Sequence, residues 1–123
     1  MSPLDRHGNY YPGDEARPDA AVASAARTVT GNGSSFNTAQ ADSFEGFLTV
    51  SAASGTTPTL DVRLETSVDA GTSWTTVGAF AQATAATTKN RVFGPLGDTC
   101  RWAWTIAGTT PSFTFAVAVE ANN

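Results

Sequence analysis

This chain of 123 residues carries a formal net charge of −4, from 11 Asp and Glu against seven Lys and Arg. Phosphate binding needs several clustered Lys or Arg side chains, and the sequence has no such cluster, so nucleic acid is not an expected partner. No apolar run approaches the roughly 18 residues of a membrane span, so a membrane is not expected as a partner either. The length corresponds to one domain, and the many Thr, Ser, Gly and aromatic residues favour an all-β fold.

The first 26 residues differ in character from the rest of the chain, and we predict that residues 1–26 form an extended N-terminal arm on a domain at 27–123. They hold three Pro, both Tyr and the only His, without a sustained period of 2 or 3.6. At about 3.3 Å per residue the arm could extend up to about 85 Å and reach a neighbouring molecule. Leu4, Tyr10 and Tyr11 are its candidate anchors; the alternative is a loose terminus without a partner. The start lacks the basic and apolar regions of a signal peptide, so we expect synthesis in the cytoplasm.

From residue 27 onward, alternation of apolar and polar residues predicts short strands between Gly- and Pro-containing turns. Seven or so such strands, spaced by turns every 8 to 12 residues, indicate an antiparallel two-sheet β-sandwich, immunoglobulin-like or jelly-roll, with the topology left open. The predicted strands are 27–30, 44–52, 60–68, 74–80, 91–93, 100–107 and 113–119.

One parity of these strands is strongly apolar and predicts the core between the two sheets. Cys100, the only cysteine, has the same parity as the neighbouring Trp residues. We therefore expect a buried, unpaired thiol, with a reactive thiol as the alternative. The predicted inward-facing residues are Leu60, Val62, Leu64, Trp74, Trp102, Trp104, Phe113, Phe115 and Val117.

A tight turn is predicted after the strand at 60–68, where the sequence runs from Ser67 to Trp74. Asp69 can accept hydrogen bonds from backbone N–H groups two residues on, Gly71 can adopt positive φ, and Trp74 anchors the returning strand. This stretch resembles the Asp-box hairpin, Ser-x-Asp-x-Gly-x-Thr-Trp, with Ser73 in the Thr position. In that family the motif is structural, so the resemblance implies a folding device and no chemistry.

The sequence Gly-Thr-Thr-Pro occurs twice, at 55–58 and at 108–111, each time between two alternating strands. A shared sequence in a shared position predicts two hairpins of equal construction, in which Gly supplies an unusual φ and Pro prevents the ladder from extending. Two copies are too few for a solenoid or a propeller.

No constellation of residues predicts catalysis, a metal or a cofactor. His7 is the only His and lies in the predicted arm, and no Gly-x-Ser-x-Gly elbow is present. Asp61 and Glu65 alternate with Arg63, which favours a solvated, charge-balanced face over an acid–base pair. One Cys and one His cannot form a zinc site, and Asp69 is better explained as a turn cap than as a calcium ligand. We therefore expect that the protein is not an enzyme.

The region 44–119 resembles small β-sandwich structural proteins of tailed bacteriophages, through the stretches at 59–74, 101–104 and 108–114. The resemblance implies a capsid decoration or cement protein on the exterior of the virion head, commonly trimeric. Its implied partners are the major capsid protein and neighbouring copies of itself.

Two other functions compete with this expectation. The first is a carbohydrate-binding or tail-associated adhesion module, for which Phe47 on a nominally outer face is the favourable feature, although the Trp residues share inward parity. The second is an ordinary intracellular interaction domain.

Overall fold

The computed structural model describes residues 14–38 and 41–122. Within them the fold is all-β, as predicted, with antiparallel pairing between all neighbouring strands and one short 3₁₀ turn. Leu4, Tyr10 and Tyr11 lie outside the described residues. The elements are β1 (Asp14–Ala16), η1 (Pro18–Ala20), β2 (Val22–Arg27), β3 (Gly31–Asn32), β4 (Phe36–Asn37), β5 (Ser43–Ser67), β6 (Thr75–Ala79), β7 (Thr87–Phe93) and β8 (Thr99–Asn122).

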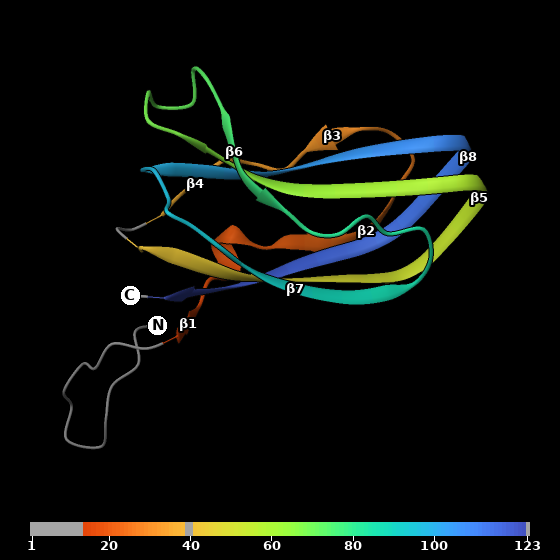
Figure 1. Cartoon of the computed structure of the whole chain (residues 1–123), viewed down its shortest axis with the longest axis horizontal. Coiled ribbons are helices and arrows are strands. Elements are labelled where there is room, and N and C mark those ends of the chain that lie inside the picture. Colours follow the sequence, from red (N-terminus) through yellow and green to blue (C-terminus); the bar gives the residue numbers. More distant parts are fainter. Residues whose placement is uncertain (1–13, 39–40, 123) are drawn as a thin grey trace.

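The long strands β5 and β8 pair with each other along their length and fold double, which produces two layers (Figure 1). One layer combines residues 43–54 of β5 with 112–122 of β8 and is extended by β7, β1 and β2. The other combines 59–67 with 99–107 and is extended by β6, β3 and β4. The two layers form the predicted sandwich, and among the described residues β5 and β8 join them into one continuous eight-stranded sheet.

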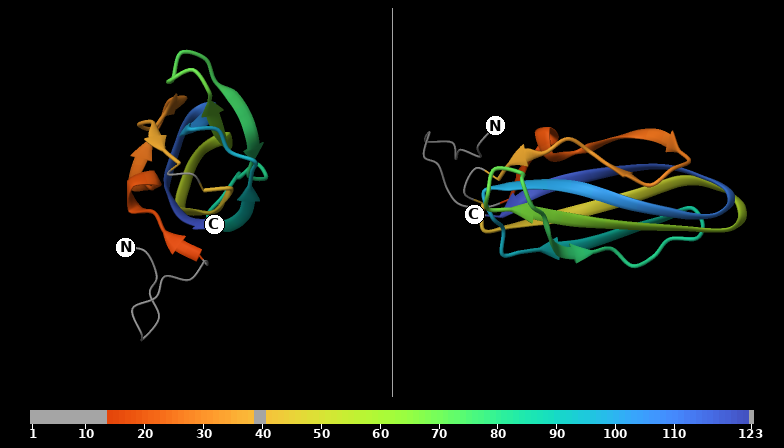
Figure 2. Two further views of the ribbon diagram at one scale, coloured as in Figure 1. Left: turned by 90° about the vertical axis from the view of Figure 1, so that its left-hand side faces the viewer. Right: turned by 90° about the horizontal axis from the view of Figure 1, so that it is seen from above.

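The two Gly-Thr-Thr-Pro segments are the bends at which β5 and β8 double back. They do not form separate hairpins, because the halves of each strand lie in different layers, and Thr56 pairs with Thr109 instead. Gly55 and Gly108 have φ of +114° and +121°. A Cβ atom on either would lie 2.8–2.9 Å from backbone atoms of the opposite bend, so glycine is required at both positions. The two bends thus hold each other at the end of the sandwich (Figure 2).

The core lies between the two layers, and the predicted inward parity is confirmed for every residue named above except Trp74. Trp74 is only half-buried because the turn carries it over the outer face of the sheet, where its ring packs on the Arg101 guanidinium at 4.4 Å. Cys100 is buried and unpaired, as predicted. Burial raises the pKa of its thiol.

Residues 14–27, called the N-terminal segment below, belong to the folded sandwich. β1 and β2 pair with β8, and Ala20 and Val22 are buried. The predicted boundary between arm and domain at residue 26 is therefore too late in the sequence. The alanine run between Val22 and Arg27 forms a strand because the edge of β8 offers it backbone hydrogen bonds that its own composition does not reveal.

Candidate functional site

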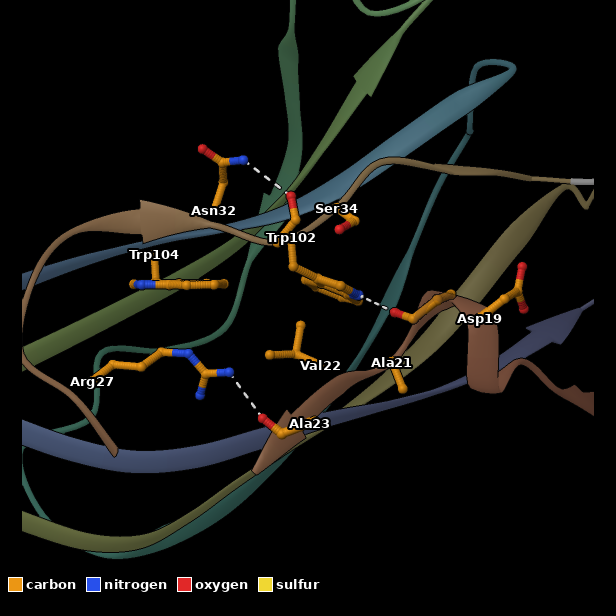
Figure 3. A pocket seen from close by; sticks show the side chains of 11 residues that line it. Asp19, Ala21, Val22, Ala23, Arg27, Asn32, Ser34, Trp102 and Trp104 are labelled. Atoms are coloured by element: carbon orange, nitrogen blue, oxygen red, sulfur yellow. Dashed lines mark hydrogen bonds between the residues drawn. The ribbon is translucent and has the colours of Figure 1, made fainter. Parts of the chain in front are cut away.

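A groove of about 480 Å³ runs along one side of the sandwich, between β2 and the β3–β4 stretch (Figure 3). A second hollow of about 300 Å³ adjoins it and shares Arg27, Asn32 and Trp104. The two hollows follow the side on which β2, from one layer, approaches β3, from the other. The groove residues named in Figure 3 are Asp19, Ala21, Val22, Ala23, Arg27, Asn32, Ser34, Trp102 and Trp104.

Trp102 closes the inner end of this groove. Its side chain is 1% exposed, and its indole Nε1–H donates to the carbonyl oxygen of Ala20 at 2.8 Å. On the core side its ring stacks on Phe80, at 5.7 Å between ring centroids, and meets the edge of Phe93 at 5.2 Å. Trp102 therefore ties the N-terminal segment to the core.

Arg27 spans the groove from the end of β2. Its Nη1 donates to the carbonyl oxygens of Ala25 and Phe115, both at 3.0 Å, and its Nη2 donates to Ala23 O at 2.9 Å. Its guanidinium also lies 5.0 Å from the Trp104 ring centroid and 4.5 Å from that of Phe115. The register between β2 and β8 shifts here, so Arg27 supplies donors to carbonyls where the regular ladder is interrupted.

The electrostatics of the groove match a structural role for its charges. Burial lowers the pKa of the Arg27 guanidinium. At the other end, Asp19 forms an ion pair with Arg17 at 2.8 Å, and the hydrogen bond from Arg17 holds the pKa of the Asp19 carboxyl below its usual range. Neither charge is matched with a nucleophile. Asn32 and Ser34 give the groove a polar, exposed rim.

The predicted turn from Ser67 to Trp74 joins β5 to β6 and holds three of its predicted residues together. Asp69 accepts hydrogen bonds from the backbone N–H of Ser73 at 2.9 Å and from the hydroxyl of Ser67 at 2.7 Å. The buried Ser67 hydroxyl in turn accepts from the Gly71 N–H at 2.9 Å, and Gly71 has φ of +89°. Hydrogen bonds from Ser73 and Ser67 lower the pKa of Asp69 to about 2. These contacts stabilise the turn between β5 and β6.

The charged row beside this turn differs from the predicted solvated face. Glu65 is only 8% exposed and accepts from Arg101 Nε at 2.7 Å and from Arg63 Nε at 3.1 Å. Burial raises the pKa of Glu65, but the two guanidinium groups outweigh burial, so that its pKa lies below the usual range. Asp61 instead accepts from the Gln82 amide at 3.0 Å. The row is thus an ion-pair network rather than a solvated stripe.

No chemistry-bearing cluster emerges from the part of the chain that the structure describes. In residues 14–38 and 41–122, no three His, Cys, Asp or Glu side chains gather as a metal site would need. The same residues contain no helix that is long and apolar enough to cross a membrane.

Sequence reasoning missed the two residues that organise this side of the molecule, Ala20 and Arg27. A backbone carbonyl carries no sequence signal, and a single Arg after an alanine run resembles any exposed charge. The one feature of the sequence that could have indicated this contact is the alanine run between Val22 and Arg27. Small side chains on a short strand allow a neighbouring Arg to fold back along the strand to its carbonyl groups.

Comparison with known proteins shows what this architecture is similar to. No family model matches the chain, and no curated protein matches it. Among solved structures, the fold is similar to that of the PBSX exported protein XepA, with a TM-score of 0.63 and 15% sequence identity. The match covers 99% of this chain and 48% of XepA, so the chain spans about half the length of that protein. At this identity the likeness establishes a shared fold.

Proposed function

We propose that this protein is a non-enzymatic structural protein of a tailed-bacteriophage virion, made in the host cytoplasm, which decorates the capsid exterior and stabilises the head. The observation that carries the proposal is the fold, shared with the PBSX exported protein XepA over nearly the whole of this chain.

Residues 1–13, which precede β1, are the proposed contact with the major capsid protein and with neighbouring copies, for example in a trimer. β1 starts beside the end of β8, where Asp14 pairs with Asn122, so β1 lies at the end of the sandwich opposite the bends (Figure 1). Thirteen residues reach at most about 43 Å, at about 3.3 Å per residue. That length exceeds the diameter of about 35 Å expected for a small domain. Several such contacts per oligomer would bind with an effective-concentration advantage.

The test is deletion of residues 2–13, followed by addition of the truncated protein to heads that lack it. We expect the circular-dichroism spectrum and Trp fluorescence of the domain to be retained, because the described sheet begins at Asp14. We expect head binding and the heat resistance of the heads to fall sharply. A triple substitution of Leu4, Tyr10 and Tyr11 by Ala is the matched control that keeps chain length. Full occupancy and full heat resistance with the truncated protein would remove residues 1–13 from the mechanism.

A carbohydrate-binding or tail-associated adhesion function is less well supported. Sugar platforms present two or three exposed aromatic rings together, whereas Trp102 and Trp104 are buried. The half-buried rings of Phe47 and Trp74 lie on different layers, so they cannot form one platform. Binding of the purified protein to a glycan array would favour this alternative over head decoration.

A further inference from the structure

The N-terminal segment packs mainly on a single strand. β1, η1 and β2 all contact β8, and Arg17 adds hydrogen bonds from its guanidinium to the carbonyl oxygens of Asn37 and Thr38, at 2.6 and 3.0 Å. Buried side chains and a buried hydrogen bond hold the segment there, through Val22 and the Ala20 carbonyl. The segment therefore binds the rest of the domain in the manner of a peptide added to a sheet edge.

The remaining long strands pair with one another and not through this segment. β8 is paired with β5 along its other edge from Thr99 to Asn122, and β5 carries β6 and β7. What the segment covers is the second edge of β8 in its C-terminal half, including Phe115 and Val117. An uncovered strand edge with apolar residues beside it tends to recruit another strand. This edge of β8 is thus a binding site for another strand.

A short exposed connection joins the segment to the remainder of the chain. Residues 28–30 link β2, in one layer, to β3, in the other. Val29 in the middle of this connection is 70% exposed. The hydroxyl of Thr30 accepts from the Ile106 N–H at 3.0 Å and marks where the chain becomes fixed to the second layer. A brief exposed connection between a peripheral strand and a complete body is the arrangement in which strand exchange between copies occurs.

We propose that the N-terminal segment exchanges between copies of this protein, so that residues 14–27 of one copy fill the β8 edge of a second copy. Every contact made within one chain, including the Trp102 hydrogen bond and the three Arg27 hydrogen bonds, is also available between two chains. The equilibrium between binding within one chain and binding between two chains then depends on the connection at residues 28–30 and on the local concentration of neighbouring copies. That concentration rises when copies are held side by side. The inference deepens the proposed partnership between neighbouring copies and rests on it for its biological setting. Exchange itself can be measured with the purified protein alone.

The register of β2 and β8 provides a direct test. Ala26 and Thr114 are cross-strand partners, and such Cα pairs are about 4.5–5.5 Å apart, within the range that a disulfide spans. Two single variants are prepared, A26C and T114C, each with Cys100→Ala. They are incubated together at high concentration and then oxidised with oxidised glutathione. Because each chain has one thiol, a cross-linked dimer of the two different variants can form at this register only if a segment occupies the neighbour's β8.

Matched controls separate exchange from chance collision. T88C places an exposed thiol on β7, at a position that does not face residue 26. We expect at least tenfold more mixed dimer from A26C with T114C than from A26C with T88C, and a yield that increases with protein concentration. A single chain with both A26C and T114C should close an internal disulfide, which checks the register. An internal disulfide in that chain, together with equal mixed yields for T114C and T88C, would overturn the exchange. Head binding is measured separately, so failure of exchange and failure of head decoration are distinguishable.

Discussion

Trp102 donates its indole N–H to the backbone carbonyl oxygen of Ala20 at 2.8 Å, across 82 positions of the sequence. The bond is buried, and it joins the N-terminal segment to the ring at the centre of the core aromatic cluster. Removal of the chain up to and including Ala20 would leave the buried indole N–H of Trp102 without its partner, at a typical cost of about 1–3 kcal/mol. We therefore expect trimming of the N-terminus through Ala20 to destabilise the domain.

Arg27 should be needed for its planar guanidinium and not only for its positive charge. We expect Arg27→Lys and Arg27→Met both to lower the free energy of unfolding, by about 1–3 kcal/mol, because neither side chain can donate to the carbonyls of Ala23, Ala25 and Phe115 together. Urea unfolding followed by Trp fluorescence measures this change. Lys89→Met, which alters a half-buried charge on β7, is the control. Full rescue by Lys would show that charge alone accounts for the role of Arg27.

Gly55→Ala and Gly108→Ala should be among the most damaging single-methyl changes in the chain. At both positions φ is far into the region that favours glycine, and the added Cβ would lie within 3 Å of backbone in the opposite bend. We expect each to cost at least the roughly 1–3 kcal/mol typical of a forced backbone conformation. Gly71→Ala is the comparison, because its φ is also positive but its nearest contact is the Trp74 ring at 3.5 Å. Thermal melting curves should rank Gly71→Ala as clearly milder. Equal losses for all three would show that backbone contact between the bends adds nothing.

Asp69 should contribute stability that depends on pH. Its pKa is about 2 in the folded chain against an ordinary value of 3.8. The folded state therefore favours the charged carboxylate, and the resulting stability is fully present above about pH 4 and lost as the pH falls toward 2. We expect Asp69→Asn to lower the melting temperature at pH 7, and the gap from the unsubstituted protein to narrow between pH 4 and pH 2. Asp61→Asn, which alters a carboxylate that accepts hydrogen bonds from the Gln82 amide, serves as the control. A gap that stays constant with pH would contradict this account of the turn.

The sequence alone determined the local features of this protein. Alternation along a strand depends on the backbone period of two, so the inward parity of Leu60, Val62 and Leu64 followed directly, as did the burial of Cys100. The turn at Asp69 was likewise predictable, because its hydrogen bonds join residues that are close in sequence, although Asp69 accepts from the N–H of Ser73, four residues on, and the Gly71 N–H donates to Ser67.

Tertiary structure decided which edges meet. Only the pairing of strands distant in sequence shows that the two Gly-Thr-Thr-Pro segments contact each other, and that residues 14–27 pair with the edge of β8. The position of Trp74 over Arg101, outside the core, also depends on how the turn lies across the sheet. A strand edge offers the same backbone donors and acceptors whatever its side chains are. The choice of partner therefore rests on the packing of the whole domain, which no local pattern records.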